Sequence, residues 1–97
     1  MDKQTILGVV RTITDGIKDA GMQYDYATDA RRCGETALAE MHLAEMQRRL
    51  NGAQEWYKKT MSMLSDDVEL DALSEALIQD YMDRYHDLVK KLENTNR

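Results

Sequence analysis

The sequence predicts an all-α fold, an antiparallel up-down-up bundle of three long helices with coiled-coil-like packing. Apolar residues recur at alternating spacings of four and three, the repeat of helices that pack along one seam. The 97 residues include no proline and only five glycines, which argues against the many turns that a β-sandwich or barrel requires. The length fits a single helical domain, residues 1–97.

The first helix is expected over about residues 3–32. Its seam passes through Gly16 and Gly21, each of which costs a helix about 1 kcal/mol relative to alanine. Asp2 is suited to cap its start, and Gly34 to end it. The seam consists of Ile6, Val10, Ile13, Ile17, Ala20, Tyr24 and Ala27.

The second and third helices are expected over about residues 35–64 and 67–94. Asp66, with Glu69 three residues later, forms a capping-box pattern that predicts the start of the third helix. Connections this short force each helix to run antiparallel to its predecessor. The second seam consists of Ala39, Leu43, Met46, Leu50, Ala53, Tyr57, Thr60 and Leu64. The third consists of Leu70, Leu73, Leu77, Tyr81, Tyr85, Leu88 and Leu92.

Charge and hydropathy exclude several classes of partner. With 13 basic and 18 acidic residues, the net charge of −5 disfavours binding to nucleic-acid phosphates. The one aromatic-basic cluster, residues 56–59, is expected to pack the bundle with lysine stems along its rim. The longest apolar runs are too short to span a bilayer. A single cysteine beside seven methionines fits a reducing compartment, so we expect a cytoplasmic protein with no nucleic-acid or membrane partner.

No pattern in the sequence predicts catalysis. A glycine-rich phosphate loop, a G-x-S-x-G elbow and an H-E-x-x-H motif are all missing from it. Cys33 follows two arginines, which favour a thiolate, but no histidine lies near it in the chain. We therefore expect Cys33 to be a small buried thiol at a helix end, and the protein not to be an enzyme.

A metal site is the alternative reading. Antiparallel helices folded at the expected turns place Glu45 level with His86, and Asp25 level with His42. Carboxylates and imidazoles in one layer suit iron or manganese, as in ferritin-like di-iron bundles. The Glu-x-x-His spacing of such bundles is missing, and His86 points away from the seam of its own helix, so oligomerisation would have to complete the site. The candidate ligands are Asp25, Glu35, His42, Glu45, Asp83 and His86.

Apolar residues outside the three seams favour a different function. They gather near the first turn, and a helix that is apolar on two faces is normally covered on both. We expect these residues to form the interface of a homodimer or higher oligomer. The protein is then a non-enzymatic association module, an adaptor, assembly factor or structural subunit. It binds itself, with another helical protein as a second class of partner, and it uses no cofactor. The interface residues are Met22, Tyr26, Ala30, Cys33, Ala37, Met41 and Ala44.

Overall fold

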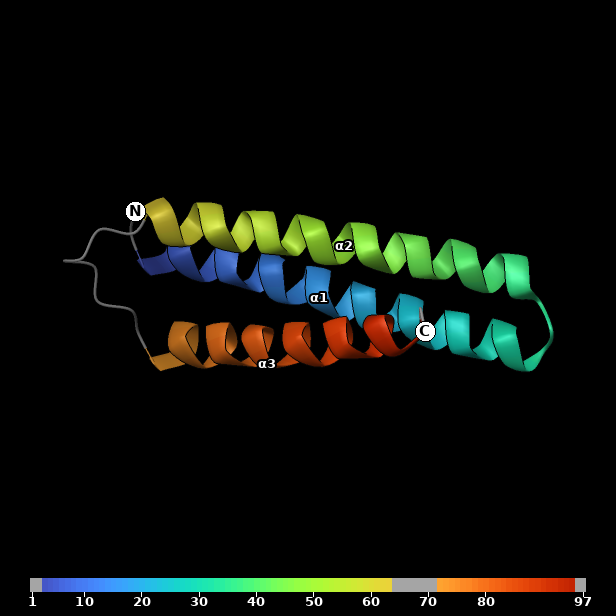
Figure 1. Ribbon diagram of the computed structural model, residues 1–97. Helices are drawn as coiled ribbons and strands as arrows, with labels where there is room; N and C mark the ends of the chain where they lie inside the picture. Colours follow the sequence, from blue (N-terminus) through green and yellow to red (C-terminus); the bar gives the residue numbers. More distant parts are fainter. Residues whose placement is uncertain (1–2, 64–71, 96–97) are drawn as a thin grey trace.

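The computed structural model describes residues 3–63 and 72–95, which form three helices (Figure 1). These are α1 (Lys3–Arg32), α2 (Thr36–Met63) and α3 (Ala72–Thr95). Helix α2 runs back along α1, and α3 returns parallel to α1, which packs against both (Figure 1). The predicted all-α three-helix bundle and its first break are confirmed. The expected start of the third helix at residue 67 lies outside the described residues, as do Asp2, Leu64, Asp66, Glu69 and Leu70.

Helix α1 is continuous through both of its internal glycines. A Cβ atom added to Gly16 would lie 3.8 Å from Cβ of Ala53, an ordinary contact distance, so α2 passes close to α1 at this level. A Cβ atom at Gly21 would meet nothing within 4 Å. The two glycines therefore weaken the helix without interrupting it, because burial of its seam offsets their low helix propensity.

The turn between α1 and α2 depends on Gly34, whose φ of 76° lies in the left-handed region. The amide of Glu35 donates to the carbonyl of Ala30 (2.8 Å), and the amide of Gly34 donates to the carbonyl of Arg31 (3.0 Å). These two bonds form a Schellman motif. The carbonyl of Glu35 already accepts from the amide of Ala39 (3.0 Å), so α2 begins directly where the motif ends.

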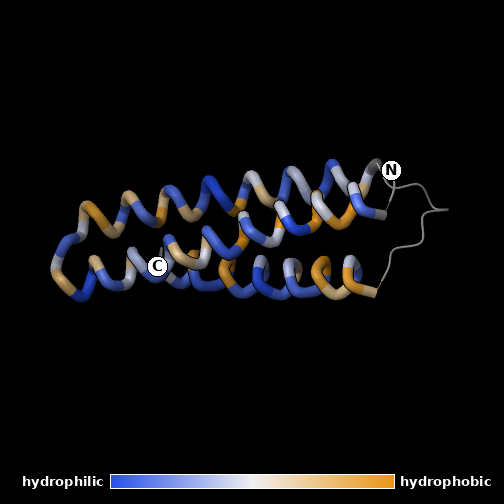
Figure 2. The backbone as a smooth tube through the Cα atoms, turned by 180° about the vertical axis from the view of Figure 1, so that it is seen from behind, coloured by the Kyte–Doolittle hydropathy of each residue, from blue (hydrophilic) through white to orange (hydrophobic). Residues whose placement is uncertain are grey.

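The seams predicted for the first two helices are confirmed as the centre of the core. Their described members are buried except Tyr24 and Tyr57, which are half-buried. Figure 2 shows hydrophobic residues recurring at intervals along each helix. Several of the buried positions on α1 and α2 are small, which lets the two helix axes approach closely. These small buried residues are Ala20, Ala27, Ala30, Ala39 and Ala53.

Helix α3 is held by larger side chains. Tyr81 is 1% exposed, lies 5.1 Å from the Tyr57 ring between centroids, and donates its hydroxyl hydrogen to Oε1 of Gln54 (2.7 Å). The hydroxyl of Tyr57 also reaches Sδ of Met82 (3.7 Å). Helices α2 and α3 otherwise make few contacts, so these rings span the space between them. Burial of Tyr81 raises the pKa of its phenol well above the ordinary value.

One position of the third seam was predicted wrongly. Leu73 is 49% exposed, whereas its neighbour Ser74 is buried. Ser74 lies seven residues before Tyr81, two helical turns away and on the same face. Leu73 lies eight residues before Tyr81 and is rotated by about 80° from it at 100° per residue, which turns its side chain toward solvent.

Candidate functional site

The tip of the α1–α2 hairpin extends beyond the end of α3 (Figure 1). There the bundle is two helices thick, and on one side the hairpin carries an open pocket of about 380 Å³. The floor and walls are mostly apolar, whereas two carboxylates contribute to its lining. The lining residues are Tyr26, Asp29, Ala30, Cys33, Glu35, Leu38 and His42.

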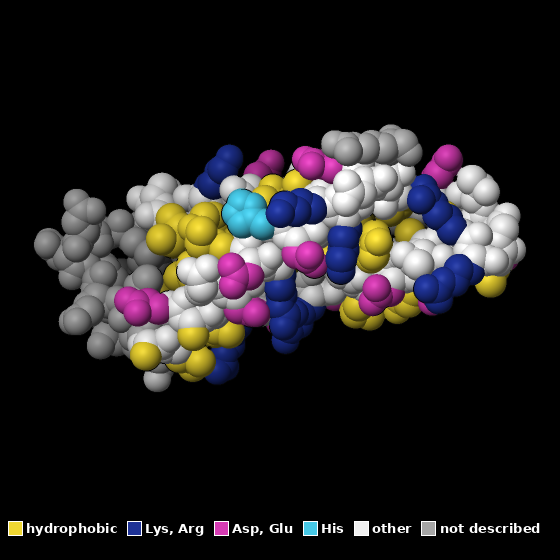
Figure 3. Space-filling view, turned by 60° about the horizontal axis from the view of Figure 1, so that its bottom comes forward, with side chains coloured by type: hydrophobic (Ala, Val, Ile, Leu, Met, Phe, Trp, Pro, Cys, Tyr) yellow, Lys and Arg dark blue, Asp and Glu magenta, His cyan; other side chains and the backbone are white. Residues whose placement is uncertain are grey.

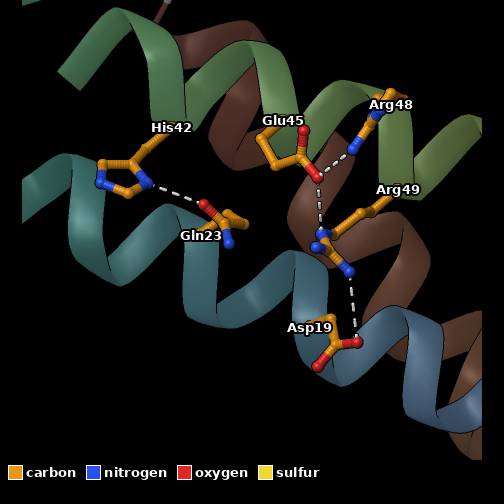
Figure 4. Close-up of polar contacts among 6 residues, drawn as sticks. All are labelled: Asp19, Gln23, His42, Glu45, Arg48 and Arg49. Atoms are coloured by element: carbon orange, nitrogen blue, oxygen red, sulfur yellow. Dashed lines mark hydrogen bonds and ion pairs between the residues drawn. The ribbon is translucent and has the colours of Figure 1, made fainter. Parts of the chain in front are cut away.

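His42 has a fixed position at this pocket (Figure 4). Its Nδ1–H donates to Oε1 of Gln23 on α1 (2.7 Å), and its ring lies 5.4 Å from the Tyr26 ring between centroids, tilted by 51°. Both contacts join α2 to α1, so they hold the two walls of the pocket together. The imidazole acts here as a structural bridge.

A charged cluster lies next to the pocket on the same pair of helices. The carboxylate of Glu45 accepts from Arg48 (2.6 Å) and lies 3.1 Å from Nε of Arg49, whose Nη1 donates to Asp19 (3.3 Å; Figure 4). The hydrogen bond from Arg48 holds the pKa of the Glu45 carboxyl below its ordinary value. Arg49 links the helices, whereas the side chain of Arg48 remains 77% exposed.

The residues predicted as one interface occupy several surfaces. Tyr26 and Cys33 line the pocket. Ala30 also borders it, but is only 5% exposed because it packs inside the hairpin, so the expectation that it lies outside the core is wrong. Met22 borders a groove between α1 and α3, and Ala44 borders a depression at the end of α3.

The remaining predicted residues, Ala37 and Met41, are exposed on α2. Met41 is 68% exposed, the highest value among the large hydrophobic side chains of the described segments. Leu38 was not predicted, although it is 40% exposed and lines the pocket. Its spacing to Met41 is three residues, the signal that would have placed both on one side of α2.

Two further expectations are corrected by their exposure. Trp56 does not pack the bundle: it is 53% exposed, and Nζ of Lys59 lies 5.5 Å from its ring centroid. Its neighbour Tyr57 is the aromatic residue that turns inward, 100° away around the helix. Cys33 is exposed instead of buried, because it lies in the turn after the last residue of α1.

The six alternative metal ligands are dispersed. In the described parts of the chain, no group of three or more histidine, cysteine or acidic side chains is placed to hold one ion. His42 is bonded to Gln23 and Glu45 to arginines, whereas Asp83 accepts from Gln79 (3.0 Å). Asp25 borders the α1–α3 groove, Glu35 the hairpin pocket, and His86 is exposed beside Tyr85.

The expected register between α2 and α3 was also wrong. It placed Glu45 level with His86, whereas the structure pairs Gln54 with Tyr81 and Tyr57 with Met82. These contacts displace α3 by about one to two turns from the expected register. The register between α1 and α2 is confirmed near His42, which contacts Gln23 and Tyr26, the neighbours of its expected partner Asp25.

The side turned forward in Figure 3 has a mixed surface, with acidic and basic side chains beside separate hydrophobic patches. Among the described helices, none has an apolar stretch long enough to cross a membrane. No family model, curated protein or solved structure matches this chain.

Proposed function

We propose that this protein is a non-enzymatic association module that assembles with itself, first as a homodimer. The observation that carries the proposal is the hairpin tip, which α3 leaves uncovered and where large apolar side chains remain at the surface. Met41, Tyr26 and Leu38 are 68%, 45% and 40% exposed. Burying such side chains against a second molecule is favourable, by about 25 cal/mol for each Å² of apolar surface removed from water.

The proposed role is that of an adaptor, assembly factor or structural subunit. Its three long helices give it an elongated form, with principal extents of 52 × 18 × 16 Å, which suits lateral contact along a helix. Its single cysteine beside seven methionines favours a reducing compartment, the cytoplasm. A further helical protein is a second class of partner for the same surface.

Sedimentation equilibrium at tens of micromolar tests the proposal. We expect a dimer for the wild type and a monomer for Met41→Asp, because the substitution places a carboxylate in an apolar contact at a cost of several kcal/mol. Leu73→Asp is the matched control. Leu73 is also a large apolar side chain at the surface, but it lies at the start of α3, away from the hairpin tip, so its variant should remain dimeric.

Circular dichroism of the same samples separates dissociation from unfolding. Met41→Asp should retain its helicity, because the buried seam through Leu43, Met46 and Leu50 is unchanged. A wild-type protein that sediments as a monomer would contradict the proposed function.

A further inference from the structure

The outer side of α2 carries exposed apolar residues at two separated places. Leu38 and Trp56 are 40% and 53% exposed. They are 18 residues apart, which is five turns, so they point in the same direction about 27 Å from each other. Met41 lies on the same side, one turn along from Leu38. One helix therefore presents two apolar sites of different shape to solvent.

The two sites differ in a complementary way. At the Leu38 end the surface is hollowed into the hairpin pocket, whose lining includes the carboxylates of Asp29 and Glu35. At the Trp56 end an exposed indole projects, with Nζ of Lys59 5.5 Å from its ring centroid and exposed Glu55 beside it. Oδ1 of Asp29 lies 4.0 Å from Nη1 of Arg32, and both side chains are exposed. Among the described residues, Glu35 forms no ion pair, so its charge is available to a partner. A projecting apolar side chain that carries Lys59 over its ring thus matches an apolar pocket lined by two carboxylates.

The segment between the two sites is self-complementary as well. Glu45 and Arg48 lie on the same side of α2, midway between Leu38 and Trp56. When two copies of α2 lie antiparallel about a two-fold axis between these residues, each Glu45, itself bonded to Arg48 of its own copy (2.6 Å), comes opposite Arg48 of the other copy. In this register Leu38 and Trp56 lie within one residue, about 1.5 Å, of directly opposite each other. Met41 then comes opposite Gly52, which has no side chain, and around which an added Cβ would meet nothing within 4 Å.

We propose, on the basis of the self-association proposed above, that a second copy of this chain docks antiparallel along α2, with Trp56 of each copy in the hairpin pocket of the other. The arrangement has a two-fold axis that passes between Glu45 and Arg48. It uses both sites of each copy, so the assembly closes as a dimer. A tryptophan knob in an apolar pocket is also the kind of contact that dominates protein interfaces.

Disulfide cross-linking tests the register. In a Cys33→Ser background, Met41→Cys and Gly52→Cys proteins are prepared separately, mixed, and oxidised with glutathione disulfide. We expect cross-links between the two variants, and little cross-linking of either variant with itself, because only the unlike positions face each other. Glu75→Cys, exposed near the start of α3, is the control and should not cross-link to either.

Fluorescence tests the pocket, because Trp56 is the only tryptophan in the chain. As the protein concentration rises through the dimer dissociation constant, the emission maximum should shift to shorter wavelength as the indole leaves water. Leu38→Asp, which places a charge in the pocket, should abolish that shift and raise the dissociation constant at least tenfold. Leu73→Asp should leave both unchanged.

The results separate this proposal from the broader one. A wild-type dimer whose Met41→Cys copies cross-link to one another, or whose Trp56 emission does not depend on concentration, would overturn the antiparallel arrangement and leave self-association standing. A chain that stays monomeric at tens of micromolar would overturn both.

Discussion

The contact between α1 and α2 and the contact that attaches α3 to them use side chains of different sizes. The first is lined by small residues such as Ala20, Ala39 and Ala53, and it extends along the whole hairpin. The second depends on Tyr81, on its ring neighbours and on a groove partly lined by charged side chains. Small residues give close backbone packing, in which an enlarged side chain forces the helices apart. Helix α3 is instead attached by larger side chains spread along its length, with Tyr81 the largest of them and with Leu88 and Leu92 also buried.

Tyr81→Ala should have the largest effect, because it removes the side chain that anchors α3. Truncating a buried aromatic residue costs about 3–5 kcal/mol of unfolding free energy. Urea denaturation measures the loss. Tyr26→Ala is the control: Tyr26 is 45% exposed, so its truncation should cost far less. Equal losses for the two variants would contradict the anchoring role of Tyr81.

Ala39→Leu tests the other contact. Ala39 has 0% exposure, so three additional carbon atoms force α1 and α2 apart, at a cost of about 1–3 kcal/mol. Ala37→Leu adds the same atoms at an exposed position and should change the stability by less than about 0.5 kcal/mol. If Ala39→Leu is as stable as the wild type in thermal denaturation, the helices do not meet as closely as described.

Gly34→Ala should destabilise the hairpin by about 1–2 kcal/mol, because a side chain is disfavoured at the φ of 76°. Gly21→Ala should do the opposite and stabilise by about 1 kcal/mol, since Gly21 is helical and has open space around its Cβ position. Chemical denaturation of both variants checks the opposite signs. A stabilising Gly34→Ala would rule out the left-handed turn.

Tyr81→Phe should have the smallest effect at neutral pH, about 1 kcal/mol, from the hydrogen bond to Gln54. It should also change the pH dependence. The pKa of Tyr81 is raised in the folded protein, so the unfolded chain loses its phenol proton first, and stability falls as the pH rises above about 10. The variant should lose part of this alkaline slope in denaturant titrations. An unchanged slope would contradict the raised pKa.

The sequence was sufficient to predict α1 and α2, because their seams repeat regularly and burial follows the repeat. It was less sufficient for α3. Leu73, Leu77, Tyr81 and Tyr85 follow one another at successive spacings of four, so a straight helix rotates Leu73 by about 80° from Tyr81. Spacing within one helix also contains no information about the register between α2 and α3, which depends on tyrosine side chains that meet across the gap.

The candidate surface was predicted in part. The apolar excess near the first turn was visible in the sequence, and Tyr26, Cys33 and Met41 are indeed exposed there. Which of these residues share a surface depends on where each helix turns relative to its neighbour. Leu38 and Trp56 were missed as a pair because Trp56 was considered only within residues 56–59 and Leu38 was not considered at all. The two residues share one face because they are five turns apart on an unbroken helix.

The tight turn at Gly34 has a consequence for the order in which the chain folds. Contacts between α1 and α2 close loops that grow outward from Gly34, and the first of them join residues few positions apart. Contacts between α1 and α3 close much longer loops, because the whole of α2 lies between these helices in the sequence. Short loops close at a lower entropic cost, so the hairpin should form early and α3 should attach last. The uncovered tip of the hairpin should therefore be the first part of the molecule to fold, before the contacts with α3 form.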